Sequence, residues 1–139
     1  MLGEVLTTMP FGNVVVDVAF TGGDLWKVFK GIVSKTSQFN GQIVTSFVQV
    51  SKDIKFKYNP AAAVGSRLVE LSISNKPLSA SDGTAYKIST WDFLANGGDN
   101  FWPRQCEFIT LDKQDEVFAA YLKRSGPLAG QLDGRISTV

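Results

Sequence analysis

The hydrophobic pattern of the chain changes from that of a strand to that of a helix at one residue, Thr21. Residues 13–20, which precede it, are rich in β-branched side chains and predict a strand. Thr21 is a favoured helix N-cap, and Asp24 follows three residues later as in a capping box. The next apolar residues recur at intervals of three and four, which predicts one buried helical face made of Leu25, Trp26, Val28, Phe29, Ile32 and Val33.

The rest of the chain adds strands and a second helix. β-Branched and alternating runs predict strands at residues 43–50, 54–58, 67–73 and 85–90. A helix is expected over residues 113–124, with Asp112 as N-cap, Gly126 as the stop, and Val117, Phe118, Tyr121 and Leu122 as its apolar face. We therefore predict an α+β fold, in which a mixed β-sheet packs with at least two amphipathic helices. Residues 1–139 suit a single domain, since no repeat or linker divides them.

Composition excludes several classes of protein. Hydrophobic residues make up 44% and charged residues 19% of the chain, which excludes intrinsic disorder. The 14 basic and 13 acidic residues nearly cancel and form no basic stripe, so we expect no nucleic-acid partner. No apolar run approaches the ~20 residues that span a bilayer, and no signal peptide is visible, so we expect no membrane partner.

The chain contains no histidine. A Ser-His-Asp or Cys-His nucleophile system is therefore impossible within it, and so is a zinc or dinuclear metal site that uses histidine. Cys106 is the only cysteine, and we interpret it as a small, half-buried packing residue. We accordingly expect no catalytic residue and no metal site in this chain.

The segment 91–101 is the best candidate for a binding site. It leads from an apolar run into a glycine-rich turn that carries Asp99 and is bracketed by aromatic residues. Glycine lets a ligand approach the backbone closely, Asp99 can accept hydrogen bonds from sugar hydroxyls, and an aromatic ring offers a face to a flat base. The residues alone leave two alternatives open, Phe93 as a core residue and Asp99 as a cap of the next segment. Of the flanking tryptophans, we expect Trp91 in the core and Trp102 at the rim of the site.

Residues 93–101, FLANGGDNF, closely resemble the FLxxGGDGF motif of the C-terminal domain of the 5′-nucleotidase family. That family includes the ecto-5′-nucleotidases and the bacterial UDP-sugar hydrolases. Asn100 stands where the family more often has glycine, and Asn also tolerates left-handed conformations. Similar segments follow the family's order from about Leu2 to Ile136: Pro10-Phe11-Gly12-Asn13, Thr21-Gly22-Gly23-Asp24-Leu25, Phe47-Val48-Gln49-Val50-Ser51, Tyr58-Asn59-Pro60, Gly65-Ser66-Arg67, Tyr121-Leu122 and Asp133-Gly134-Arg135-Ile136.

The resemblance implies a role for this chain in nucleotide recognition. Members of the family clamp the nucleobase between two phenylalanines of this domain, and the matching positions are Phe11 and Phe93. The acid of the GGD motif accepts hydrogen bonds from the ribose hydroxyls, which assigns that role to Asp99. Asn96, Gly97 and Gly98 are expected to shape the loop at the substrate. The implied ligand is a purine nucleoside or nucleotide, bound weakly.

The resemblance also implies that chemistry belongs elsewhere. In the family, the metal ligands and the catalytic histidine lie in an N-terminal metallophosphoesterase domain. We therefore expect this chain alone to be non-catalytic and to hold no cofactor. The parent would be a metal-dependent 5′-nucleotidase, a phosphoric monoester hydrolase of nucleotide catabolism, whose divalent metals sit in the N-terminal domain. That domain would be the partner of this one.

Two further expectations follow from the same resemblance. The family's upstream Asn and GG-x-R segment would end just before Met1 and Leu2, so we expect a truncated chain, either a piece of the parent or a natural protein that kept only the recognition half. The family suggests a secreted, cell-surface or periplasmic location. One alternative is a stand-alone secreted interaction module that keeps the fold without using the nucleotide site. A carbohydrate-binding module would also use aromatics and an acid, but no motif supports it.

Overall fold

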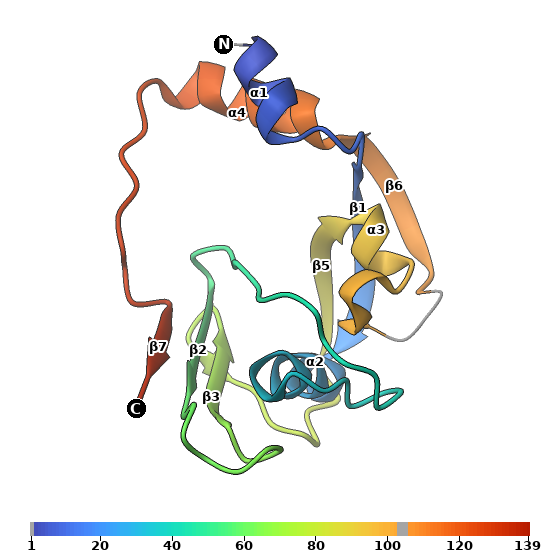
Figure 1. Cartoon of the computed structure of the whole chain (residues 1–139), viewed down its shortest axis with the longest axis vertical. Coiled ribbons are helices and arrows are strands. Elements are labelled where there is room, and N and C mark those ends of the chain that lie inside the picture. Colours follow the sequence, from blue (N-terminus) through green and yellow to red (C-terminus); the bar gives the residue numbers. More distant parts are fainter. Residues whose placement is uncertain (1, 103–105) are drawn as a thin grey trace.

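The computed structural model describes residues 2–102 and 106–139. Two β-sheets enclose a central helix, α2 (Figure 1). The first sheet has the strand order β5-β1-β6 and the second the order β4-β3-β2-β7. The strands are β1 (Val14–Thr21), β2 (Ile54–Tyr58), β3 (Leu68–Ile73), β4 (Lys76–Pro77), β5 (Ala85–Trp91), β6 (Phe108–Lys113) and β7 (Ile136–Thr138).

Strands that are distant in sequence pair in both sheets. In the first sheet, β1 is antiparallel to both neighbours, and Val16 lies opposite Thr90 of β5 and Thr110 of β6. In the second sheet, β2 runs antiparallel to β3 and parallel to β7, with Phe56 opposite Ile136. The second sheet is therefore mixed, and the predicted α+β class with a mixed sheet is confirmed.

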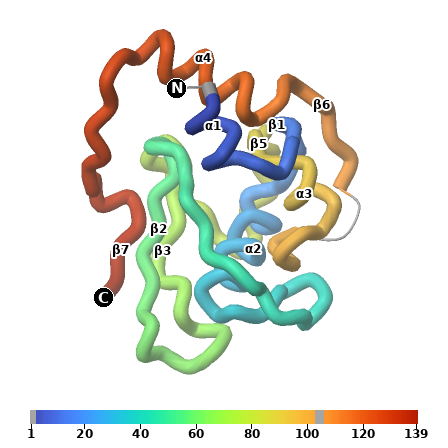
Figure 2. Tube along the Cα trace, turned by 45° about the horizontal axis from the view of Figure 1, so that its top comes forward, coloured from blue at the N-terminus to red at the C-terminus, as the bar shows by residue number. Residues whose placement is uncertain are grey.

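The helices take two positions relative to the sheets. Helix α2 lies between them, whereas α1 and α4 pack against each other at one end of the molecule (Figures 1 and 2). Residues 126–135 then lead from α4 to β7. The helical segments are α1 (Leu2–Thr8), α2 (Gly22–Ser34), α3 (Asp92–Ala95), the 3-10 turn η1 (Gly98–Asn100) and α4 (Gln114–Ser125).

The junction between β1 and α2 has the predicted capping geometry. The Thr21 hydroxyl accepts a hydrogen bond from the Asp24 backbone N–H at 3.1 Å and donates one to the Asp24 carboxylate at 2.8 Å. These bonds satisfy one of the backbone donors that every helix N-terminus leaves unpaired. Helix α2 ends at Ser34, and the next residue, Lys35, has a φ of 57°, the left-handed conformation common after a last helical turn.

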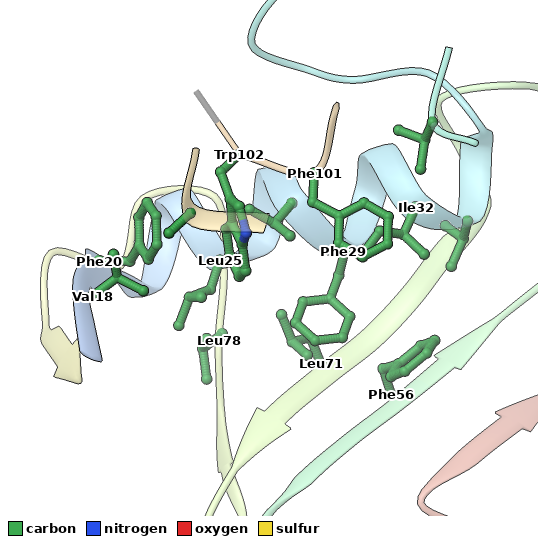
Figure 3. Close-up of a cluster of buried hydrophobic side chains, with 14 of the residues drawn as sticks. Val18, Phe20, Leu25, Phe29, Ile32, Phe56, Leu71, Leu78, Phe101 and Trp102 are labelled. Carbon is green, nitrogen blue, oxygen red and sulfur yellow. The ribbon is translucent and has the colours of Figure 1, made fainter. Parts of the chain in front are cut away.

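The core surrounds the apolar face of α2 (Figure 3). Leu25 and Ile32 are almost fully buried, and Phe29 meets Phe56 of β2 with ring centroids 5.0 Å apart. Burying a side chain of this size contributes roughly 1.5–3 kcal/mol to the free energy of folding. Because the buried face of α2 packs between the two sheets, this energy holds them together. The predicted buried face is confirmed, with Trp26 only partly buried.

The two tryptophans beside the glycine-rich turn exchange their expected places. Trp102 is 6% exposed and stacks on Phe20 with ring centroids 4.8 Å apart, so it belongs to the core. Trp91 is 43% exposed. It lies at the end of β5, where it pairs with Val15 of β1.

Strands β1, β2, β3 and β5 confirm the predictions within a residue, but residues 43–50 form no strand. This segment makes one isolated bridge, between Ile43 and Thr36, and then runs irregularly past α2 to β2 (Figure 2). A β-branched run becomes a strand only where a neighbour offers backbone partners, and β2 is already flanked by β3 and β7. Ile43 is accordingly 71% exposed.

The second predicted helix exists, but its cap and its packing differ from expectation. Strand β6 continues through Asp112 to Lys113, so Lys113 is the N-cap residue, and it makes no side-chain capping bond. Helix α4 has no buried residue, and Val117 and Tyr121 of its apolar face are 42% and 46% exposed. Gly126 ends the helix as predicted. Within the described ranges, none of the helices is both long and apolar enough to cross a membrane.

Candidate functional site

A cavity of about 1070 Å³ brings the predicted site residues together. Its wall includes Phe11, Phe93 and Asp99. Phe11 is far from the other two in the sequence, and Phe93 and Asp99 lie on opposite sides of the glycine turn. Side chains of α2 and of residues 46–51 form other parts of the wall. Ligand sites in proteins commonly measure about 300–1000 Å³, so the volume is ample for a small molecule.

The two phenylalanines expose their rings. Phe11 follows α1 in a turn where Gly12 adopts a φ of 63°, and its side chain is 84% exposed. Phe93 is the second residue of α3 and is 50% exposed. A core position for Phe93 is thereby excluded. Large apolar rings that stay in water at a cavity wall are typical of ligand-binding surfaces.

Asp92 joins the two segments that carry these rings. One of its carboxylate oxygens, Oδ1, accepts hydrogen bonds from the backbone N–H of Val14 at 3.2 Å and from that of Phe93 at 2.9 Å. The start of β1, just after Phe11, is therefore fixed to the first turn of α3. Sequence reasoning did not single out Asp92, and its place between a strand and a glycine turn gave no signal of this link.

The glycine-rich turn is shaped by left-handed backbone. Gly97, Asp99 and Asn100 have φ values of 93°, 55° and 58°. A Cβ on Gly98 would lie 2.5–2.6 Å from atoms of the Phe93 ring, so only glycine lets that ring rest where it does. The Asn96 side chain turns back and donates to the Asp92 carbonyl at 2.9 Å. Asn96, Gly97 and Gly98 thus form the turn, while Phe93 and Asp99 reach the cavity.

Asp99 accepts hydrogen bonds from two hydroxyls of the segment before β2. Thr45 donates to Oδ1 at 2.7 Å, and Ser46 donates to Oδ2 through a short bond. The next residue, Asn100, donates its Nδ2 to the Ile43 carbonyl at 2.8 Å. Asp99 therefore does not cap a following segment but faces residues 43–46. Because sequence analysis assigned these residues to a strand, it missed both hydroxyls.

Few ionisable side chains line the cavity. Among the described lining residues they are Asp53, Lys87 and Asp99. The Lys87 ammonium lies 3.4 Å from the carboxylate of Asp17, whose pKa is lowered mainly by the hydrogen bond from Ser89 and also by Lys87 itself. A single lysine, already paired with an acid, is a poor site for a phosphate group, which proteins usually hold with several cationic or backbone donors.

The described residues contain no group of three His, Cys, Asp or Glu side chains placed to hold a metal ion. Cys106 is half-buried, as expected, and desolvation raises the pKa of its thiol above the usual value. A thiol with a raised pKa is a weaker nucleophile at neutral pH because less of it is ionised.

Comparison with known proteins identifies the family of this chain. Residues 1–105 match the model of the 5′-nucleotidase, C-terminal domain. The chain belongs to the 5′-nucleotidase family, as its C-terminal domain. The resemblance identified from the motifs is therefore confirmed, and the matched range includes Phe11, Phe93 and Asp99.

Several relatives support the assignment. This C-terminal domain is 30% identical to an apyrase of Tabanus yao, over 98% of the chain and 26% of the relative. It is also 30% identical to a human 5′-nucleotidase, over 92% of the chain and 23% of the relative. The structure of a 5′-nucleotidase precursor from Thermus thermophilus superposes with a TM-score of 0.80 at 26% identity, covering all of this chain and 28% of that one. The chain thus spans about a quarter of the length of these relatives.

Proposed function

We propose that this C-terminal domain recognises a nucleoside or nucleotide, with the base held between Phe11 and Phe93 and the ribose hydroxyls bound by Asp99. The observation that carries the proposal is the joint placement of these residues at one cavity. The exposed rings of Phe11 and Phe93 and the carboxylate of Asp99 all line it, and Asp92 ties the segment after Phe11 to the one that carries Phe93. Aromatic faces suit a flat base, and a carboxylate suits a pair of hydroxyls.

The expected affinity is low. Stacking on aromatic side chains is worth about 1–3 kcal/mol per base, and a hydrogen bond to a charged group about 1.5–3 kcal/mol. The cost of association consumes much of this sum. A dissociation constant of ~1 mM, or about −4 kcal/mol, is a realistic value. The phosphate of a nucleotide should add little, because Lys87 is the one cation among the described lining residues and is paired with Asp17.

Hydrolysis is assigned to another part of the parent protein. In this family the metal site lies in the N-terminal domain, and the relatives named above are about four times as long as this chain. The proposed partner is therefore an N-terminal metallophosphoesterase domain that holds the divalent metals. In this arrangement the C-terminal domain supplies binding energy for the nucleoside part, and the partner breaks the phosphate ester.

Titration of the isolated chain with adenosine, followed by NMR, tests the proposal. The amide signals of residues 97–100 and the ring signals of Phe11 and Phe93 should shift together at millimolar adenosine. Phe93→Ala should abolish the response. Asp99→Asn should weaken the binding of adenosine more than that of adenine. Asparagine is chosen because it tolerates the left-handed backbone at this position. Tyr121→Ala removes a comparably exposed ring from α4, 46% exposed, and serves as the matched control.

The outcome separates the two functional classes. If millimolar adenosine shifts none of these signals, or shifts residues away from the cavity, the chain does not recognise nucleosides on its own. The half-exposed apolar residues of α4 would then favour the interaction module, which uses the fold as a protein-binding surface.

A further inference from the structure

Three side-chain hydrogen bonds fasten residues 43–46 to the turn that carries Asp99. Thr45 and Ser46 donate to the two oxygens of the Asp99 carboxylate, and Asn100 donates to the Ile43 carbonyl at 2.8 Å. We call Thr45, Ser46 and Asn100 the carboxylate clamp. The 3-10 turn and residues 43–46 are separated by more than fifty positions in the chain, so the carboxylate clamp is a tertiary contact.

The carboxylate clamp leaves part of the carboxylate available. An ionised carboxylate has two oxygens and about four sites that can accept a hydrogen bond. Thr45 occupies one site on Oδ1 and Ser46 one on Oδ2, so each oxygen keeps a further site. Asp99 lines the cavity and is only partly buried, so those sites are open to a ligand.

We propose that Thr45 and Ser46 are positioning residues that orient the Asp99 carboxylate to accept both hydroxyls of a vicinal cis-diol, and thereby select a ribofuranoside over its deoxy analogues. The inference deepens the proposed function and rests on it. The chemical class of ligand is any five-membered sugar with free, adjacent cis hydroxyls.

The physical basis is pre-organisation. The side chain of Asp99 can rotate about two bonds, and a carboxylate free to rotate must lose that freedom when it accepts two hydroxyls at once. With one donor fixed on each oxygen, the plane of the carboxylate is set before the ligand arrives, which removes an ordering cost from binding. A sugar that lacks one hydroxyl then leaves one oriented oxygen without its ligand partner, and this loss is the source of selectivity.

Asn100 contributes through the backbone of the opposite segment. Its bond to Ile43 adds to the anchoring of residues 43–46, in which the Val44 side chain is buried and Ile43, Thr45 and Ser46 are exposed. The family more often has glycine at this position, and glycine has no side chain to make that bond. The carboxylate clamp is therefore expected to be firmer in this chain than in relatives with glycine there.

The test compares the ligand preference of variants of the carboxylate clamp. Thr45→Val and Ser46→Ala remove the hydroxyls with little change of shape, and Thr45→Ser keeps a hydroxyl at the same place. Ser66→Ala, at an exposed hydroxyl between β2 and β3, is the control. Each protein is titrated by NMR with adenosine, 2′-deoxyadenosine, 3′-deoxyadenosine and adenine, and the melting temperature is recorded.

Wild type should prefer adenosine over either deoxynucleoside by about tenfold, the effect of one hydrogen bond to a charged acceptor. The double variant Thr45→Val/Ser46→Ala should bring this ratio close to one while adenine binds as before. Each single variant should lower the ratio in part, and Thr45→Ser and Ser66→Ala should retain it.

The outcomes are distinguishable. A wild-type chain that responds to none of the four compounds refutes nucleoside recognition altogether, and this inference with it. In a second outcome, the wild-type chain prefers the riboside and the folded double variant prefers it equally or more strongly. This result leaves nucleoside recognition intact and overturns the role of the carboxylate clamp. An increased preference would mean that the two hydroxyls compete with the ligand for Asp99 rather than orient it.

Discussion

Gly98→Ala should displace the Phe93 ring without unfolding the domain. The added Cβ would lie 2.5–2.6 Å from three atoms of that ring, whereas carbon atoms in contact are usually about 3.5–4.0 Å apart. The ring must therefore move by roughly 1 Å or turn to another rotamer. Gly98 has no left-handed φ, so alanine adds no backbone strain there.

The effect on stability and the effect on binding should separate. Phe93 is 50% exposed, so its ring can move into solvent at about 0.5–1.5 kcal/mol, the cost of a poor rotamer. Loss of base stacking should cost about 1–3 kcal/mol of binding energy, which is roughly 5- to 150-fold in the dissociation constant. Gly83→Ala is the matched control, because its Cβ would meet no atom within 4 Å.

The assay is an NMR titration with adenosine beside a thermal melt of both variants. Gly98→Ala should keep a cooperative melt within a few degrees of wild type and bind adenosine at least fivefold more weakly, roughly the lower bound set by stacking. Gly83→Ala should match wild type in both measurements. If folded Gly98→Ala binds adenosine as tightly as wild type, Phe93 does not hold the base, and base binding between the two phenylalanines is refuted.

Three other predictions concern the fold and the chemistry. Gly23→Ala should lower the free energy of unfolding by about 1–3 kcal/mol, because its Cβ would lie 2.7 Å from the carbonyl oxygen of Ala80, a backbone atom that cannot move aside easily. A denaturant titration measures this change, and an unchanged midpoint would contradict the prediction. The pKa of Asp133 is lowered to about 2 by Arg135, so Asp133→Asn should reduce the melting temperature above pH ~4, and the difference from wild type should fade as the pH drops toward 2. A difference that grew as the pH fell would refute that reasoning. The chain alone should release no phosphate from AMP with any divalent metal, and turnover that follows the protein peak through repurification would disprove this.

The parts of the fold that sequence reasoning predicted are those specified by local interactions. The Thr21–Asp24 cap and the spacing of apolar residues in α2 are both contained within about fifteen residues, and both are present in the structure. Strand β2 alternates cleanly and was predicted with its observed bounds, Ile54–Tyr58.

The parts that were missed depend on distant partners. Strand β7 has only three residues and exists because it pairs with β2, and β6 exists because it pairs with β1. Residues 43–50 have a strand-like composition, but β2, the strand that follows them in the chain, is already paired on both sides, with β3 and β7. Helix α1 has only seven residues, too few for a clear periodic signal, and it packs against α4, which is distant in the sequence.

The candidate site was predictable where motifs mark it and not elsewhere. Phe11, Phe93 and Asp99 came from the family resemblance, and the structure places them at one cavity. Their supports, Asp92 and the hydroxyls of residues 45–46, are common residue types with no distinctive spacing. Sequence analysis treated Asn100 only as a departure from the motif that tolerates a left-handed backbone, and its bond to Ile43 was not predicted.

The long-range strand pairing has a consequence for folding kinetics. Val16 pairs with Thr90 and Thr110, and Phe56 pairs with Ile136, so each sheet is completed only when strands about 70 to 95 positions apart have been brought together. Domains dominated by such contacts typically fold in milliseconds to seconds, far more slowly than helical bundles of similar size. During synthesis from the N-terminus, β1 must wait for β5 and β6 with both backbone edges unpaired. Strand β2 can pair early with β3 on one edge, but its other edge must wait for β7.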